Sequence, residues 1–155
     1  GILSPILKET VNFINATALA KERGIKIKEA KTSKEEEFVN LVQLEIKTDK
    51  ETRRIGGTLS ANKQPRIVKI DDYYVEVSPT GEMIMIQNWD RPGIIGNLGT
   101  LLGKHNINIA AMTFGREKPG GKAITILNVD SPVSAGILDK IKKTENILAV
   151  KVIRL

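Results

Sequence analysis

The sequence predicts an α+β chain in which a small, mostly antiparallel α/β domain is followed by a ferredoxin-like βαββαβ domain. The second half has apolar patterns in the order strand, helix, strand, strand, helix, strand, which is the order of a split βαβ unit. The first half has short alternating segments separated by turn residues. Pro79 and Gly81 lie between the halves, so we expect domains over residues 1–79 and 80–155.

Capping and turn residues delimit the elements of the first half. Ser4 and Pro5 resemble an N-cap and a first helical position, and Gly24 resembles a helix stop. Asp71 and Asp72 predict the turn of a hairpin over residues 65–81. We therefore expect helices at 4–11 and 16–23, strands at 11–15, 25–31 and within 37–48, a return strand within 49–60, and the hairpin.

The second half has a more regular pattern. Strands are expected at 82–87, 108–116, 123–130 and 147–155, and helices at 92–105 and 134–143. In this topology both helices cover one face of a four-stranded antiparallel sheet.

The helix at 92–105 contains an unusual number of glycines. At about 100° per residue, one sector of this helix is apolar and predicts the face packed on the sheet: Ile94, Ile95, Leu98, Leu101 and Leu102. Gly96, Gly99 and Gly103 fall in the adjacent sector, although glycine inside a helix costs about 1 kcal/mol relative to alanine. Their presence indicates a close approach to the helix backbone, either by a neighbouring strand or subunit or by a ligand.

Asp90 precedes this helix, and its role has two interpretations. It occupies a position suited to an N-cap, where a carboxylate accepts from first-turn amides. Alternatively, the loop with Asp90, the helix N-terminus and Asn108 converge at one end of the sheet. There the side chains would hold the ammonium of an amino acid, and the amides would hold its carboxylate.

Composition and charge exclude several classes of partner. The net charge of +6 is spread thinly along the chain, which favours a solvated surface over a nucleic-acid site. RNA binding on such a sheet needs aromatic residues on its first and third strands, and residues 83–88 and 123–130 contain none. No apolar run reaches the roughly 18 residues of a membrane span. We expect neither nucleic acid nor a membrane as a partner.

The sequence predicts no catalytic residue, metal site or cofactor site in this chain. Cysteine is absent, and the one histidine, His105, lies at a helix end, where it suits the helix dipole better than proton transfer. The glycines follow the spacing G-x-x-G-x-x-G and not the dinucleotide fingerprint G-x-G-x-x-G. No spacing of His, Asp and Glu predicts a metal site.

Three stretches resemble known families of domains. The run DRPGIIGNLGTLLGKHNINIAAM is similar to the opening of an ACT domain, an amino-acid-sensing regulatory module. The stretches VNFINATALAKERGI and GGTLSANKQPRIVKIDDYYVEV resemble the intervening, or allosteric substrate-binding, domain of D-3-phosphoglycerate dehydrogenases. The resemblance implies the regulatory part of a cytoplasmic, NAD-dependent enzyme of L-serine biosynthesis. It also implies a catalytic domain in the same chain, NAD bound there, and an intervening domain truncated at its N-terminus.

The resemblance also implies an effector site. In serine-sensitive members, L-serine binds between two ACT domains, and the matching positions here are Asn88, Asp90 and Asn108. The same pairing implies a homo-oligomer formed through ACT domains. In the first domain Arg66 matches a basic anion-binding position, whereas Tyr73 and Ser78 stand where other members have arginine.

A structural expectation and an alternative function accompany this interpretation. Arg66 and Lys69 are three residues apart on one predicted strand, so they should point to opposite faces and not share a phosphate. The alternative function is an amino-acid sensor unit of another enzyme, such as an L-serine dehydratase.

Overall fold

The computed structural model describes residues 1–155 except 1–2, 5, 8–9, 32–37 and 39. The chain divides into two compact units, Gly1–Glu35 and Glu36–Leu155, and each is described separately. Within the described ranges, no helix is both long enough and apolar enough to cross a bilayer.

The first unit contains the helix α1 (Ala16–Glu22). Gly24 ends it with a φ of 73°, and the Gly24 amide donates to the Lys21 carbonyl, so the predicted helix and its stop are confirmed. The helix expected at 4–11 includes residues 5, 8 and 9, which lie outside the described residues. Leu3 and Ser4 form part of a turn.

Two strands predicted in this unit are wrong. Residues 11 and 12 have no regular structure, and residues 13–15 form a turn. Asn12 Oδ1 accepts from the Ile14 and Asn15 amides at 2.9 Å, which offers the backbone a local alternative to a sheet ladder. Residues 25–31 have no regular structure and are exposed. Their alternation of apolar and basic residues suits a strand, but no neighbouring strand pairs with them in the described structure.

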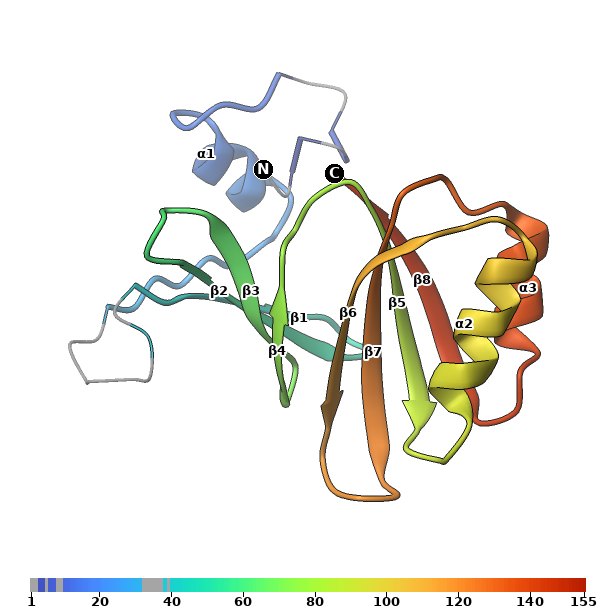
Figure 1. The fold of residues 1–155 in the computed structure, drawn as a ribbon. Helices are drawn as coiled ribbons and strands as arrows, with labels where there is room; N and C mark the ends of the chain where they lie inside the picture. Colours follow the sequence, from blue (N-terminus) through green and yellow to red (C-terminus); the bar gives the residue numbers. More distant parts are fainter. Residues whose placement is uncertain (1–2, 5, 8–9, 32–37, 39) are drawn as a thin grey trace. The chain divides into compact units, whose positions relative to one another are not determined.

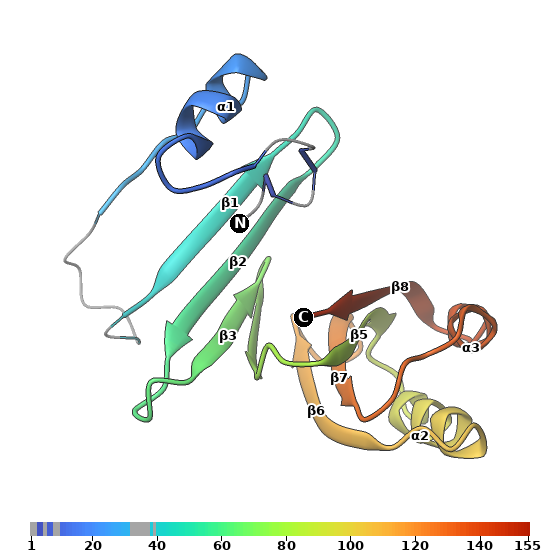
Figure 2. The same ribbon diagram turned by 90° about the horizontal axis from the view of Figure 1, so that it is seen from above.

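The second unit begins with a four-stranded antiparallel sheet in the order β1-β2-β3-β4 (Figure 2). Its strands are β1 (Val42–Lys47), β2 (Thr52–Leu59), β3 (Pro65–Ile70) and β4 (Tyr73–Val77). Asp71 and Asp72 form the β3–β4 turn as predicted, and Asp71 has a φ of 51°, which aspartate tolerates better than most residues.

A β-bulge changes the faces of β3. Lys69 pairs with Gly56 and Arg66 pairs with Thr58, which leaves Val68 without a partner on β2. Partners in a ladder share a face, as do residues two apart on β2. Arg66 and Lys69 therefore lie on the same face, and the expectation of opposite faces is wrong because one inserted residue resets the alternation.

The second sheet has the ferredoxin-like arrangement that the sequence predicts. Its elements follow in the order β5 (Glu82–Trp89), α2 (Ile94–Lys104), β6 (Ile109–Arg116), β7 (Lys122–Val129), α3 (Ala135–Lys142) and β8 (Ile147–Arg154). The strands lie in the order β6-β7-β5-β8, and α2 and α3 cover one face (Figure 1). The α+β fold class is thus confirmed.

The core under these helices fixes the position of α2. Ile94, Leu98 and Leu102 of α2 are buried against Ile84 and Ile86 of β5. Ile95 was expected on the same face but is 49% exposed, because only the centre of the predicted apolar sector meets the sheet.

The opposite face of the second sheet packs on the first sheet. Val75 and Val77 of β4 share a buried cluster with Met83, Ile124 and Ile126. Thr113 Oγ1 on β6 also donates to the Glu76 carbonyl on β4 at 2.8 Å. The predicted domain boundary at 79/80 falls between β4 and β5, inside this second unit, and that division stays a prediction.

Candidate functional site

A pocket of about 520 Å³ lies at the N-terminus of α2. It is formed by the β5–α2 connection, the start of α2, the end of β6 and the β6–β7 loop. Its lining residues are Asp90, Arg91, Pro92, Gly93, Ile95, Gly96, Arg116 and Gly120. One carboxylate and two guanidinium groups thus surround a helix N-terminus.

Asp90 is held by the β6–β7 side of this pocket. Its Oδ2 accepts from Arg116 at 3.0 Å and from the Gly120 amide at 3.2 Å. The hydrogen bond from Arg116, assisted by that from Gly120, lowers the pKa of the Asp90 carboxyl below its usual range, while burial acts weakly in the other direction. Asp90 therefore carries its negative charge at neutral pH.

Asp90 is not the N-cap of α2, so that interpretation is wrong. The cap position is Gly93, with a φ of 91° that only glycine adopts readily, and no side chain caps the first turn. The two residues between Asp90 and Gly93 carry the chain around the corner, which turns the carboxylate toward Arg116. The Ile94 amide donates to the Arg91 carbonyl at 3.4 Å, and among the described residues no side chain caps this first turn, whose residues Ile95 and Gly96 line the pocket.

Asn108 lies at the other end of the sheet. Its Nδ2 donates to Asp130 Oδ2 at 2.6 Å. The next residue, Ile109, pairs with Val129 of β7, and Val129 pairs on its other side with Glu82, the first residue of β5. A strand rises about 3.3 Å per residue, so the eight residues of β5 separate Asn108 from Asp90 by roughly 25 Å. The expected convergence within one chain is wrong because α2 reverses the chain direction between the parallel strands β5 and β6. Asp90 and Asn108 can contact one ligand only when they come from two different copies.

Asn88 does not line the pocket. Its side chain is fully buried on the helix-covered face of the sheet, where Oδ1 accepts from Thr125 Oγ1 at 3.0 Å and Nδ2 donates to the Trp89 carbonyl at 2.9 Å. Both ends of the amide are satisfied inside the protein. A direct contact between Asn88 and an effector stays a prediction, and it would require these bonds to be exchanged.

The glycine face of α2 is open within the described structure. A Cβ added at Gly96, Gly99 or Gly103 would meet no atom within 4 Å outside the local helix backbone. No strand of the described chain therefore packs on these glycines. A second subunit and a ligand remain as the explanations for their presence.

Arg66 lies on the first sheet, remote in sequence from this pocket. Its guanidinium donates to Ser78 Oγ at 2.5 Å and to Gln64 Oε1 at 3.3 Å. Ser78 thus uses part of the donor capacity of Arg66. An anion-binding role for Arg66 stays a prediction.

Sequence reasoning missed Arg116 and Gly120 as site residues. Arg116 ends β6, which runs parallel to β5, and parallel strands end at the same edge of a sheet. The topology alone therefore brings Arg116 near Asp90. The glycines of the EKPGGK turn then let a backbone amide reach the carboxylate: Gly120 has a φ of 73°.

Comparisons with known proteins agree with this architecture. Residues 1–71 match the family model of the D-3-phosphoglycerate dehydrogenase intervening domain, and residues 76–146 match that of the ACT domain. The chain is 41% identical over 155 residues to a D-3-phosphoglycerate dehydrogenase of Methanocaldococcus jannaschii, covering all of this chain and 29% of that protein. It is 36% identical to the Bacillus subtilis protein of the same name, over all of this chain and 30% of the relative.

A third relative extends the comparison. The chain is 37% identical over 147 residues to a Synechocystis D-3-phosphoglycerate dehydrogenase, covering 95% of this chain and 26% of the relative. The chain thus spans less than a third of the length of these relatives. With an intervening domain followed by an ACT domain and with similarity along its whole length, the chain belongs to the D-3-phosphoglycerate dehydrogenase family and represents its regulatory C-terminal part.

Proposed function

We propose that the ACT half of this chain binds L-serine and conveys feedback control to an NAD-dependent D-3-phosphoglycerate dehydrogenase of cytoplasmic serine biosynthesis. The catalytic domain and its NAD would belong to the remainder of the same chain. A sensor unit of an L-serine dehydratase is the alternative. The dehydrogenase is favoured because the three relatives described above all bear that name.

This proposal rests on one observation: Asp90 and the N-terminus of α2, which has no side-chain cap among the described residues, line the same pocket. An amino acid is a zwitterion, so its site needs an acceptor for the ammonium and donors for the carboxylate. Both hydrogen bonds of Asp90 go to Oδ2, which leaves Oδ1 able to accept from an ammonium. The first-turn amides and the helix dipole favour a carboxylate a short distance away.

The proposal includes a second copy of the chain. Asn108 lies at the opposite end of the sheet from Asp90, so an effector held by both requires two ACT domains side by side. The open glycine face of α2 supports this arrangement because small residues allow another chain to approach the helix closely.

Calorimetric titration of the 155-residue chain with L-serine, glycine and 3-phosphoglycerate tests the effector assignment. We expect L-serine to bind and 3-phosphoglycerate, which has no ammonium, not to bind at this pocket. In Asp90→Asn the charge is removed with little change of shape. Loss of a charged hydrogen-bond partner should weaken L-serine binding about ten- to hundredfold.

Asp139→Asn is the matched control, because Asp139 is an exposed aspartate on α3 that pairs with Lys142. It should bind L-serine as the parent chain does. Equal affinity of Asp90→Asn and the parent chain for L-serine, or no binding of any amino acid, would contradict the site assignment.

A further inference from the structure

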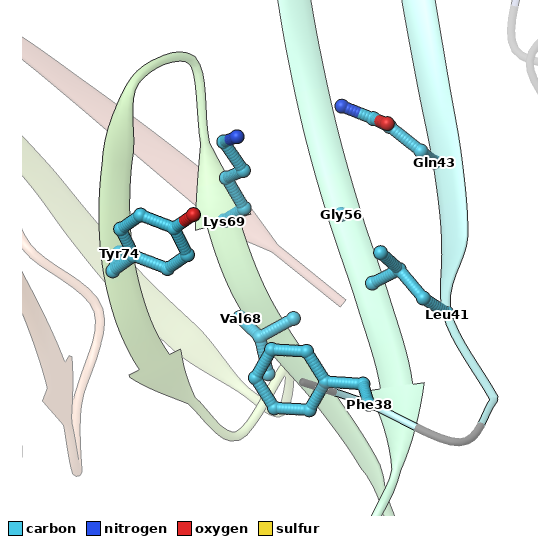
Figure 3. Close-up of a pocket in the computed structure, with 7 residues that line it drawn as sticks. All are labelled: Phe38, Leu41, Gln43, Gly56, Val68, Lys69 and Tyr74. Atoms are coloured by element: carbon cyan, nitrogen blue, oxygen red, sulfur yellow. The ribbon is translucent and has the colours of Figure 1, made fainter. Parts of the chain in front are cut away.

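A second cavity, of about 270 Å³, lies on the face of the first sheet that carries Lys69 (Figure 3). It is formed by β1, β2, β3 and β4 together with the segment that leads into β1. It shares no lining residue with the pocket at α2.

One half of this cavity is apolar. Phe38 and Leu41 lie on the segment before β1, and Val68 is the bulge residue of β3, 5% exposed. Gly56 of β2 lies between them without a side chain. A Cβ at Gly56 would lie 3.1 Å from Lys69 Cβ and 3.6 Å from Leu41 Cδ1, so this glycine keeps the cavity floor open.

The other half of the cavity is polar and carries one positive charge. Lys69 Nζ lies 5.2 Å from the centroid of the Tyr74 ring, a distance at which a cation–π interaction holds the ammonium at the rim. Gln43 adds an amide on the β1 side (Figure 3). Among the described residues, no carboxylate lines this cavity.

The β3 bulge produces this combination. Because Val68 is an extra residue in the strand, Lys69 lies on the same face of the sheet as Gly56, its partner on β2, which forms the floor of the cavity. In a regular strand the consecutive residues Val68 and Lys69 would point to opposite faces of the sheet. The bulge therefore sets an apolar surface and an ammonium beside the same opening, as bulges beside binding sites commonly re-aim side chains.

We propose that this cavity binds a small monoanion with an apolar body, such as an aromatic or branched aliphatic carboxylate. The apolar body occupies the space between Phe38, Leu41 and Val68, and the carboxylate accepts from Lys69 Nζ and the Gln43 amide. A zwitterionic amino acid fits poorly because its ammonium would lie beside the Lys69 ammonium with no lining carboxylate among the described residues to pair with it. Inorganic phosphate fits poorly because it leaves the apolar wall exposed to water.

Nuclear magnetic resonance on the isotope-labelled 155-residue chain tests this proposal with phenylacetate as the probe. We expect saturable shifts of the Leu41 and Val68 methyl resonances and nuclear Overhauser contacts between these methyls and the phenyl ring. Three further compounds separate the contributions. Neutral phenylacetamide should bind at least about tenfold more weakly because it cannot make a charge-assisted bond to Lys69. Acetate and L-serine should leave the same resonances unchanged.

Lys69→Met gives the matching test from the protein side. It keeps the aliphatic stem and removes the charge, so phenylacetate should bind at least about tenfold more weakly. Lys151→Met, at an exposed lysine of β8 in the other sheet, should bind phenylacetate as the parent chain does.

Three results would overturn the proposal. One is the absence of saturable shifts at Leu41 and Val68. Another is an equal response to phenylacetate and phenylacetamide, which needs no variant and so holds even if Lys69→Met unfolds. The third is a response of these methyls to L-serine or to acetate that equals their response to phenylacetate.

Discussion

At the residue scale, Asn88 and Thr125 are the fully buried polar side chains of the described structure. They lie on neighbouring strands, β5 and β7, and satisfy each other by the bond from Thr125 Oγ1 to Asn88 Oδ1. A buried polar pair of this kind contributes little net energy while it is intact, but either partner alone is costly. This pair also anchors the strand end that leads to Asp90.

The first prediction concerns this pair. Asn88→Ala should destabilise the chain by about 1–3 kcal/mol because it leaves the Thr125 hydroxyl buried without an acceptor. The double variant Asn88→Ala/Thr125→Val should be less destabilised than the sum of the two single variants. Urea unfolding measures both effects. Asn97→Ala, at an exposed residue of α2, is the control and should change the free energy of unfolding little. Strict additivity of the two single variants would show that the pair is not coupled.

The second prediction concerns the ionisation of Asp90. Arg116 and the Gly120 amide lower the pKa of this carboxyl in the folded chain below that of the unfolded chain, which is about 3.9. The stabilisation by this pair is therefore fully present above the unfolded pKa and is lost as the pH falls through the lower, folded pKa. A carboxyl carbon titration should give a midpoint below about 3.9 for Asp90. In Arg116→Gln this midpoint should rise. An unchanged Asp90 midpoint in Arg116→Gln would show that Arg116 is not the cause.

At the element scale, the second sheet could be predicted from the sequence because each element has a strong local signal. Periodic apolar residues mark its strands and helices, and the only differences are one or two residues at their ends. The errors in the first unit arise where a weak pattern meets a specific local bond or lacks a partner strand. At residues 11–15 the Asn12 side chain forms a turn, and at 25–31 no described strand pairs with the segment.

The site was harder to predict because it depends on register and direction. The bulge at Val68 puts Arg66 and Lys69 on one face, and a single extra residue leaves no periodic signal in a strand of six residues. The distance between Asp90 and Asn108 follows from β5 and β6 being parallel, which the predicted βαββαβ order already implied. The cavity beside Gly56 requires the pairing of Gly56 with Lys69, which no local pattern contains.

The third prediction compares two glycines of the second sheet and its helix. A Cβ at Gly115 on β6 would lie 2.8 Å from the Tyr74 carbonyl oxygen, so Gly115→Ala should destabilise the chain by about 1–3 kcal/mol through overpacking against β4. Gly99→Ala on α2 should instead stabilise a single copy by up to about 1 kcal/mol because its Cβ meets nothing and alanine favours a helix. Urea unfolding at low protein concentration measures both. A stable Gly115→Ala would show that β4 and β6 do not pack so closely in solution.

At the scale of the whole molecule, the arrangement of strands predicts association. The second sheet has β6 and β8 as its edge strands, and β4 approaches β6 through the Thr113 bond. The outer edge of β8 pairs with no described strand, and proteins usually cover such an edge. The open glycine face of α2 adds a surface that another chain can approach.

The fourth prediction follows from these surfaces. Sedimentation equilibrium should show a dimer or a larger assembly of the 155-residue chain at micromolar concentration. If the glycine face of α2 lies in the contact, Gly99→Ala should weaken association even though it stabilises the single copy. A monomer at high micromolar concentration would contradict assembly through the ACT half.

The fifth prediction joins assembly to effector binding. Asp90 and Asn108 lie at opposite ends of one sheet, so a shared L-serine site must combine Asp90 of one copy with Asn108 of another. Asp90→Asn and Asn108→Ala should each weaken L-serine binding when studied alone.

Mixing the two variants tests this arrangement. After their subunits exchange, half of the dimers contain one copy of each variant, and each of these mixed dimers contains one site with both residues intact. Calorimetry should then recover about a quarter of the parent number of sites at parent affinity. If both residues served a site within one copy, every chain in the mixture would carry a lesion and mixing would restore nothing. The recovered fraction therefore separates a site between two copies from a site within one, independently of how strongly each residue contributes to binding.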